Sequence, residues 1–388
     1  MRIDLDQNAT TPLDPEAREA MAAALTSLHG NPSSLHAAGR RAREAVEGAR
    51  EAVAQLIGAC PEDIIFTSGG TEANNLAIAG TLARIGGWLA VSQIEHPSVL
   101  HCAANSRERG FPVTEVPPDP DGVVRVEAFV DGGGPGPALV SLMTANNETG
   151  CIQPVAALGR AARERDWLVH TDAVQAIGKI PIDVRELGAD LLTMSAHKIG
   201  GPKGVGALWA RPGARPRPLF HGGGQENGVR PGTENVAGIV GFGAAARVAA
   251  RRGRAEAESA ARLRDTLEAR VTRRVPAAVA LGAGTLRVPN TSFIAFDGIE
   301  GTTLVQRLDL MGVACSTGAA CEARSSTGSH VLEAMGIDRR LARGGVRFSL
   351  GFGTTIDEIE AAVERIATAV EEIGWGERSP RVPVRRSR

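Results

Sequence analysis

Five short apolar runs, each followed by glycine or polar residues and then by a helical pattern, constrain the fold of this chain more than any other feature. The runs lie at residues 64–67, 88–91, 138–142, 167–170 and 191–194. Continuous apolar runs of this length are typical of strands that are buried on both faces of a parallel sheet. Their alternation with helices therefore predicts an α/β domain built on a large, mostly parallel, doubly wound sheet.

A smaller α+β domain is expected to follow the sheet domain. An Ala/Arg/Glu-rich stretch at residues 244–271 predicts a single helix that bridges the two. Five elements are expected after it, strands at residues 290–296, 313–315 and 345–350 and helices at 301–310 and 356–373. We predict a large domain at residues 15–255 and a small domain made of residues 1–14 and 256–388, because 388 residues are too many for one ordinary domain.

Charge and cysteine content exclude several classes of function. The chain has 43 basic and 44 acidic residues and a net charge of −1, so no nucleic-acid or membrane partner is expected. The basic tail at residues 381–388 is expected to be solvated charge. No apolar stretch approaches the ~18 residues of a membrane span, and the first residues lack a leader pattern, so we expect a cytoplasmic protein. Five cysteines without a Cys-x-x-Cys pair predict free thiols and no metal site.

The segment after the fifth apolar run contains the strongest candidate for covalent chemistry. In an open parallel sheet the ligand binds beyond the carboxyl ends of the strands, and Lys198 comes directly after such an end. The chain has only three lysines beside 40 arginines, and only a primary amine can condense with an aldehyde. Lys198 is therefore a candidate Schiff-base lysine, although most lysines simply face water.

Other strand ends supply groups suited to a pyridine ring and a phosphate. Asp172 could keep a ring nitrogen protonated, and Gln175 could donate to a phenolic oxygen. His96 could stack on a flat ring or move protons. Gly70 and Thr71 open a helix and could bind a phosphate. Taken singly, each has a plainer interpretation: a helix cap for Asp172, a surface histidine for His96, and a capped glycine turn for Gly70 and Thr71.

Nine blocks, taken together and in this order, carry a family resemblance. They lie at residues 6–12, 30–34, 67–72, 95–96, 146–150, 172–175, 195–198, 230–233 and 315–321. In this order they resemble the pyridoxal-phosphate cysteine desulfurases of the NifS/IscS type, which share the class V aminotransferase fold. The resemblance runs over about residues 3–373 and implies a pyridoxal-phosphate-dependent transferase of fold type I. It also implies pyridoxal 5'-phosphate as the cofactor.

The resemblance implies roles for individual residues. Lys198 would hold the cofactor as a Schiff base, Asp172 would pair with the ring nitrogen, Gln175 would face the phenolic oxygen and His96 would stack on the ring. Four residues would bind the phosphate: Gly70, Thr71, Ser195 and His197. Thr233 would reach the phosphate of a neighbouring subunit, which implies a homodimer.

The substrate and the nucleophile are also implied. Asn147, beside the cofactor, and Arg347 would hold the substrate carboxylate, Arg347 through a bidentate fork. Cys321 would be the nucleophile, on a mobile loop near residues 315–329, because the atom attacked is the sulfur of the substrate. The plainer alternative, a buried structural thiol, suits Cys315 better. Glu322 departs from the family pattern and should raise the pKa of the Cys321 thiol unless Arg324 or the field of the cofactor offsets it.

The function implied is a cysteine desulfurase that converts L-cysteine to L-alanine. The sulfane sulfur would remain as a persulfide on Cys321, with Lys198 and His96 moving protons. An acceptor protein or scaffold, for iron-sulfur cluster assembly or another thio-compound, would then receive it. A related selenocysteine lyase or C–S lyase and a non-catalytic sulfur-transfer scaffold stay open as alternatives. A Rossmann-type oxidoreductase fits less well because no Gly-x-Gly-x-x-Gly follows the first strand.

Overall fold

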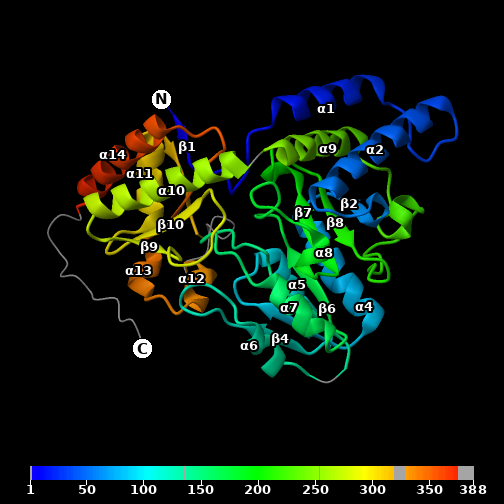
Figure 1. Cartoon of the computed structure of the whole chain (residues 1–388), viewed down its shortest axis with the longest axis horizontal. Helices are drawn as coiled ribbons and strands as arrows, with labels where there is room; N and C mark the ends of the chain where they lie inside the picture. The colour runs from blue at the N-terminus through cyan, green and yellow to red at the C-terminus, as the bar shows by residue number, and fades with distance from the viewer. Residues whose placement is uncertain (1, 135, 253, 319–327, 375–388) are drawn as a thin grey trace.

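The chain folds into a large sheet domain and a smaller domain beside it, as Figure 1 shows. The structure, a computed structural model, describes residues 2–134, 136–252, 254–318 and 328–374. None of the helices in these ranges combines the length and the apolar character that crossing a membrane requires. The tail at residues 381–388 and the segment 319–327 lie outside the described residues.

The large sheet has seven strands in the order β2-β8-β7-β6-β5-β3-β4. The strands are β2 (Ile64–Thr67), β3 (Trp88–Ser92), β4 (Val113–Val116), β5 (Ala138–Ser141), β6 (Leu168–Asp172), β7 (Leu191–Ser195) and β8 (Gly206–Ala210). β8 is antiparallel to both of its neighbours, whereas the pairs from β7 across to β4 are parallel. The carboxyl ends of all the strands except β8 therefore lie at one edge, and the predicted mostly parallel sheet is confirmed.

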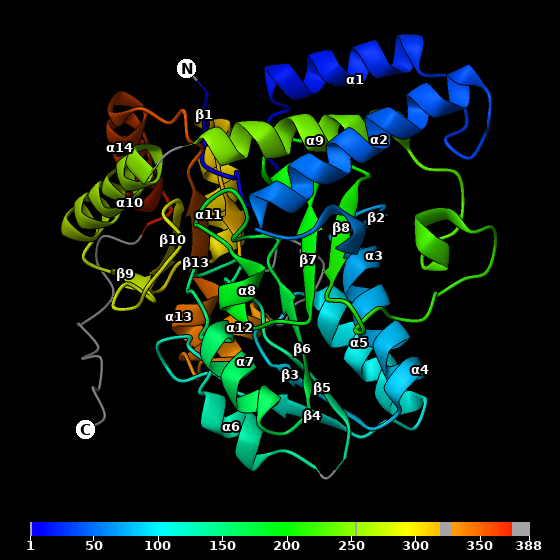
Figure 2. The same cartoon turned by 45° about the vertical axis from the view of Figure 1, so that its right-hand side comes forward.

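Alternate residues of each strand contribute to two separate apolar cores, one on each face of the sheet. In β2, Ile64 and Phe66 belong to one core and Ile65 to the other. In β3, Ala90 belongs to the first and Leu89 and Val91 to the second. Because successive side chains of a strand point to opposite faces, continuous apolar runs need cover on both sides. Helices supply that cover, which makes the sheet doubly wound (Figure 2).

The helices of the large domain divide between these two faces. Those that contribute to the first core include α1 (Pro15–Ser27), α2 (Ala37–Leu56), α6 (Val126–Asp131), α7 (Val155–Arg163), α8 (Val184–Leu187) and α9 (Val236–Arg251). The second core is covered by α3 (Gly70–Asn75), the π-helix η2 (Leu76–Gly80), α4 (Thr81–Ile85) and α5 (Pro97–Glu108). Three short 3₁₀ turns complete the domain: η1 (Pro61–Asp63), η3 (Ala196–Lys198) and η4 (Gln225–Gly228).

The smaller domain is built on a four-stranded antiparallel sheet in the order β12-β13-β10-β9. Its strands are β9 (Ala278–Leu281), β10 (Thr291–Phe296), β12 (Ser316–Thr317) and β13 (Gly345–Ser349). A parallel pair lies beside it, formed by β1 (Ile3–Asp4) and β11 (Val313–Ala314). Its helices are α10 (Arg254–Arg274), α11 (Gly301–Leu310), α12 (His330–Ala334), α13 (Arg339–Arg343) and α14 (Ile356–Glu372).

Two expectations about this architecture need correction or addition. The single bridging helix predicted at residues 244–271 is wrong, because α9 ends at Arg251 and Arg252 leaves the helical conformation with ψ 114°. α9 packs on α1 and α2, whereas α10 packs on α14, and one straight helix could not lie on both surfaces. Five strands were not expected from the sequence: β1, β4, β8, β9 and β12. The division at residue 255 stays our proposal for the domain boundary.

A buried ion pair fixes one corner of the large domain. Arg50 of α2 donates to both carboxylate oxygens of Glu226, at 2.8 and 2.9 Å, and also to the Ile64 carbonyl oxygen. The same carboxylate accepts the Phe66 backbone N–H at 2.9 Å. Glu226 has φ 47°, in the left-handed region that non-glycine residues rarely adopt. The pair therefore holds the strained η4 segment against the edge strand β2.

We expect Arg50→Met to destabilise the fold by about 3–5 kcal/mol, because it leaves the Glu226 carboxylate buried without its cation. Urea unfolding followed by circular dichroism measures this. The matched control is Arg270→Met, which removes an exposed ion pair with Glu360 and should cost about 1 kcal/mol or less. Equal costs for the two variants would contradict the assigned role of the buried pair.

Candidate functional site

A cavity of about 410 Å³ opens at the carboxyl edge of the large sheet, where the small domain meets it. Ten residues singled out from the sequence line it: Gly70, Thr71, His96, Asn147, Asp172, Gln175, Ser195, His197, Lys198 and Arg347. All but Arg347 belong to the large domain. They lie at or after the carboxyl ends of the strands that run parallel to one another in the large sheet. The strand-end argument from the sequence thus leads to one place in the molecule.

Two described residues singled out from the sequence, Thr233 and Cys315, do not line this cavity. Thr233 is exposed on the segment after η4 and does not line the cavity. Cys321 and Glu322 lie outside the described residues. Cys315 is buried as expected, and burial raises the pKa of its thiol well above the ordinary value. Cys315 is therefore unsuited to act as a thiolate.

A chain of hydrogen bonds links Asp172 to His96. Asp172 Oδ1 accepts the Val174 backbone N–H at 2.9 Å, and Oδ2 accepts Asn74 Nδ2 at 2.7 Å. Asn74 Nδ2 also donates to Ser98 Oγ at 2.8 Å, which lies 2.7 Å from His96 Nδ1. Two partners hold the Asp172 carboxylate in a fixed direction, toward the cavity that it lines.

The environment of His96 assigns its tautomer. His96 caps helix α5, and the Ser98 backbone N–H donates to His96 Nδ1 at 3.1 Å. Because Nδ1 accepts this bond, the neutral ring carries its proton on Nε2. Burial lowers the pKa of His96, and the positive charge of Lys198 adds to this while Asp172 opposes it. His96 is thus a neutral ring with one N–H donor.

One corner of the cavity combines small residues with hydroxyl and imidazole groups. A Cβ atom on Gly70 would lie 3.0 Å from Val174 Cγ2 and 3.6 Å from Ser195 Cβ, so a larger residue would fill this corner. His197 Nδ1 lies 3.2 Å from Thr10 Oγ1. Burial, together with Lys198 and Lys203, lowers the pKa of His197 to about 4, so the ring is neutral. The corner therefore offers polar donors of the kind that bind a phosphate group.

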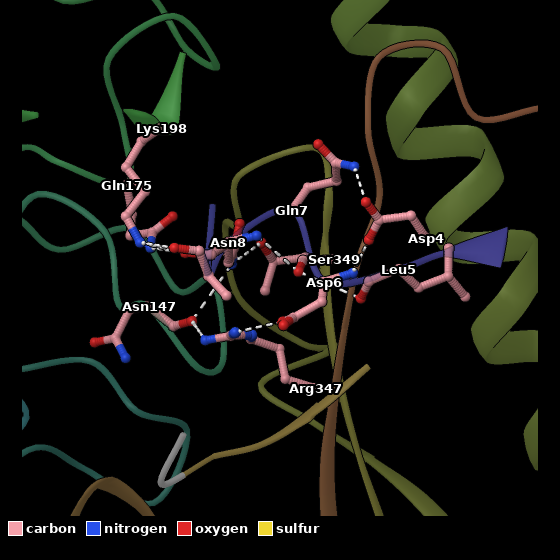
Figure 3. A network of polar contacts seen from close by, with 12 residues as sticks. Asp4, Leu5, Asp6, Gln7, Asn8, Asn147, Gln175, Lys198, Arg347 and Ser349 are labelled. Atoms are coloured by element: carbon pink, nitrogen blue, oxygen red, sulfur yellow. Dashed lines mark hydrogen bonds and ion pairs between the residues drawn. The ribbon is translucent and has the colours of Figure 1, made fainter. Parts of the chain in front are cut away.

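Lys198 extends toward the N-terminal segment of the chain. Its Nζ donates to the carbonyl oxygens of Asn8 and Ala9, the latter at 2.9 Å. The Asn8 carbonyl also accepts Gln175 Nε2 at 3.0 Å, and Figure 3 shows Lys198 and Gln175 both directed at Asn8. Asn8 Oδ1 accepts Lys179 Nζ at 2.7 Å. The amine that could hold an aldehyde is thus ordered by backbone of the opposite domain.

Arg347 brings a positive charge into the cavity from strand β13. One of its terminal nitrogens donates to Asp6 Oδ1 at 2.8 Å and the other to the Asn147 carbonyl oxygen at 3.0 Å, as Figure 3 shows. Arg347 Nε and Asn147 Oδ1 are buried and have no hydrogen-bond partner among the described residues. Since each terminal nitrogen carries a second hydrogen, the guanidinium can still bind a carboxylate.

The donor set fits a flat, phosphorylated pyridine aldehyde. Asp172 offers a fixed carboxylate for a ring nitrogen, and His96 offers a flat neutral ring. Lys198 offers a primary amine, and Gly70 leaves room beside the hydroxyl of Thr71 for a phosphate. The chemistry of these groups agrees with the cofactor that the sequence implied.

Sequence reasoning did not assign a role to several residues that build this site. They are Asn8, Asn74, Ser98, Glu148 and Lys179. Asn8 lies in a recognised block, and Lys179 is one of the three lysines. The block could have identified Asn8 as a site residue, and the scarcity of lysines could have identified Lys179. Asn74 contacts Asp172, which lies 98 positions away in the sequence, and Ser98, which lies 24 positions away. No local sequence pattern reveals contacts of this kind.

Comparisons with known proteins agree with this geometry. The family model for "Aminotransferase class-V" matches residues 3–362. The chain is 46% identical over 376 residues to a cysteine desulfurase of Cereibacter sphaeroides, covering 96% of each chain. It is 44% identical over 374 residues to cysteine desulfurase IscS of Dictyoglomus turgidum, covering 96% of this chain and 95% of that one.

Solved structures give the same result. A NifS-like protein superposes with a TM-score of 0.90 at 38% identity, covering 96% of this chain and 100% of its own. The protein SspA, solved in complex with cysteine, superposes with a TM-score of 0.80 at 33% identity, covering 90% of this chain and 99% of its own. Both likenesses extend across the large and the small domain.

Glu95 is a buried carboxyl group directly before His96. Its Oε1 accepts bonds from Ser92 Oγ at 2.8 Å and the Met143 backbone N–H at 2.7 Å. Burial raises the pKa of Glu95 to about 8, and the charge of Asp172 adds to the rise. In neutral solution the folded protein therefore keeps this carboxyl protonated, whereas the unfolded chain does not.

This shift predicts a pH-dependent stability. Between pH ~4.5 and about 8 the native state binds a proton that the unfolded state lacks, so the wild type loses stability as pH rises. Glu95→Gln does not titrate at this position. We therefore expect the unfolding free energy of Glu95→Gln, minus that of the wild type, to increase by up to about 5 kcal/mol from the lower to the upper end of this pH range.

Urea unfolding of the two proteins at pH 5, 6.5 and 8 measures the difference. Glu51→Gln, at an exposed carboxylate, is the control variant and is unfolded at the same three pH values. A constant difference for Glu95→Gln between pH 5 and 8 would refute the elevated pKa.

Proposed function

This chain belongs to the class V aminotransferase family and is a pyridoxal-phosphate-dependent cysteine desulfurase, and on this premise we propose the role of each residue in its cavity. The enzyme converts L-cysteine to L-alanine and retains the sulfur as sulfane sulfur. The observation that carries this function is the near full-length match to cysteine desulfurases. The gathering of the residues picked from the sequence around one cavity supports the proposed roles.

Residues from four strand ends hold the cofactor in this proposal. Lys198 would bind it covalently through Nζ, Asp172 would pair with its ring nitrogen, Gln175 would donate to its ring oxygen and His96 would stack on the ring. The phosphate lies in the corner made by Gly70, Thr71, Ser195 and His197. When bound, the cofactor supplies an electron-accepting ring that stabilises negative charge at the α-carbon of the substrate.

Arg347 and Asn147 bind the carboxylate of L-cysteine. Arg347 is held by Asp6 and by the Asn147 carbonyl oxygen, so its remaining N–H groups are aimed before the substrate arrives. Preorganised donors of this kind avoid the cost of ordering a long side chain on binding. The carboxylate thereby fixes the substrate with its α-carbon near Lys198.

Lys198 and His96 carry the protons. The Lys198 amine, which would hold the cofactor, would also remove the proton from the α-carbon of the substrate. The lowered pKa of His96 leaves a neutral ring with its proton on Nε2, which suits donation and return of a proton at one atom. The hydrogen-bond chain through Ser98 and Asn74 fixes the position of this ring relative to the Asp172 carboxylate.

Cys321 takes the sulfur. Its thiolate attacks the Sγ atom of the substrate, an S–S bond forms, and the C–S bond of the substrate breaks with its electron pair passing to the carbon side. Protonation of that carbon completes L-alanine, and the persulfide stays on Cys321 until a second thiolate accepts the outer sulfur. No external oxidant is needed, because the β-carbon of the substrate takes up the two electrons that the sulfur gives up as it becomes sulfane sulfur.

The assembly and the destination of the sulfur are further parts of the proposal. We propose a homodimer in which exposed Thr233 reaches the phosphate of the second copy, and its position outside its own cavity supports this. We place the reaction in the cytoplasm, since thiols stay reduced there. A sulfur-acceptor protein or scaffold, in iron-sulfur cluster assembly or a related pathway, takes the product.

Lys198→Ala and Cys321→Ala test this function directly. We expect Lys198→Ala to lose the visible absorption of the covalently bound cofactor and all activity, because no other amine replaces Nζ. Cys321→Ala should keep the visible absorption but form alanine and sulfide from cysteine at least ~100-fold more slowly, because it lacks the nucleophile. The control is Cys60→Ala, at an exposed thiol, which should match the wild type.

The contrary outcomes separate the alternatives. Full activity of Cys321→Ala would favour a selenocysteine lyase or C–S lyase. A wild type that gains no visible absorption with added pyridoxal 5'-phosphate would favour a non-catalytic scaffold.

Arg347→Lys tests the carboxylate site. Lysine keeps the charge but loses the planar fork, so we expect KM for cysteine to rise by about tenfold or more with a smaller change in kcat. Steady-state kinetics at several cysteine concentrations measure both constants. Arg307→Lys, at an exposed ion pair with Glu372, is the control. An unchanged KM for Arg347→Lys would rule out the assigned contact.

A further inference from the structure

Lys179 is a buried lysine that the proposed reaction does not use. It lies in the turn after strand β6, four residues beyond Gln175, and is only 5% exposed. Its Nζ donates to Gln175 Oε1 and to Asn8 Oδ1, each at 2.7 Å. Both of these partners are neutral amide oxygens. The charged groups that act on Lys179 from the packed elements are Lys198 and Arg347, and both are cations.

Packing alone does not account for a lysine at this position. Methionine has a similar length and would fill the same space without the desolvation cost of an ammonium group. Burial lowers the pKa of Lys179 well below its ordinary value, and the two neighbouring cations lower it further. The position is therefore unfavourable for a charge unless something negative binds nearby.

The contact with Lys179 determines which way the Gln175 amide points. The oxygen and nitrogen of a glutamine amide occupy nearly the same positions, so the amide can be turned either way. Lys179 Nζ donates to the amide oxygen, and the Asn8 carbonyl on the other side can only accept from the amide nitrogen, so the amide oxygen faces Lys179. The amide nitrogen then lies on the other side, where it donates to the Asn8 carbonyl at 3.0 Å and keeps a second hydrogen for the cavity that Gln175 lines.

We propose that Lys179 is a positioning residue that holds the Gln175 amide with its N–H group toward the ring oxygen of the bound cofactor. This rests on the proposed function, in which Gln175 donates to that oxygen. Without Lys179 only the Asn8 carbonyl opposes turning of the amide, so the amide presents its oxygen to the cavity more often. Repulsion between two oxygens would then replace a hydrogen bond.

The readout is the pH midpoint of the visible spectrum of the bound cofactor. A hydrogen-bond donor to the ring oxygen makes that oxygen less basic. The proton shared between the ring oxygen and the Lys198 nitrogen is then held less strongly, and the midpoint lies at lower pH. In Lys179→Met we expect the midpoint to rise by about one pH unit, a tenfold gain in proton affinity. Lys179→Gln should shift the midpoint in the same direction, because its amide can present either oxygen or nitrogen to Gln175 and so fixes that amide less firmly. This variant serves if Lys179→Met does not fold.

A double-mutant cycle separates positioning from a general effect on the fold. Because Lys179 acts through Gln175, the double variant Lys179→Met/Gln175→Leu should have the same midpoint as Gln175→Leu alone. Arg264→Met is the control. It removes a buried cation that donates to the Val288 carbonyl away from the cavity, and it should lower thermal stability without moving the midpoint.

Circular dichroism and thermal melting of each holoprotein establish which variants are folded. An unchanged midpoint in a folded Lys179 variant, or shifts that add in the double variant, would overturn the positioning role while leaving the desulfurase function intact. A wild type without visible absorption would instead defeat the proposed function, and the role of Lys179 with it.

Discussion

The site depends on Asn8, a single residue at which the N-terminal segment crosses from the small domain to the large one. Its backbone N–H donates to Ser349 Oγ at 2.9 Å and its Nδ2 donates to Thr291 Oγ1 at 2.8 Å, both in the small domain. Its carbonyl oxygen accepts Gln175 and Lys198 from the large domain. Loss of one of these hydrogen bonds would leave a polar group of Asn8 without a partner, which costs free energy. The bonds therefore hold the two domains in a fixed relative position beside the Lys198 amine.

The electrostatics of the cavity follow from this junction. Lys179, Lys198 and Arg347 converge from two domains, so each lies near like charges in a poorly solvated space. Such a cluster is stable only with anions close by. Asp6 supplies one for Arg347, and the phosphate and carboxylate of a cofactor and an amino-acid substrate would supply more. The fold thus places strain in the site that ligand binding relieves.

The sequence predicted what local patterns encode. Apolar runs such as residues 64–67 predicted the parallel strands because burial on both faces leaves a continuous signal, and the strand-end rule placed Lys198 and Asp172 together. The helix break at Arg252 was missed because the Ala/Arg/Glu-rich composition is the same on both sides of it. Only the helices against which the two segments pack differ. The links through Asn74 were also missed, since a hydrogen bond over 98 positions leaves no periodic trace.

The remaining thiols show why sulfur transfer belongs on a separate segment. Burial raises the pKa of Cys102 to about 11, and Cys315 is shifted further in the same direction. Cys151 is also buried, beside Thr285 Oγ1. Cys102 and Cys315 are therefore poor nucleophiles. A thiol that ionises, attacks sulfur in a cavity and then releases it to an acceptor needs contact with both the cavity and solvent, and in our proposal this task falls to Cys321.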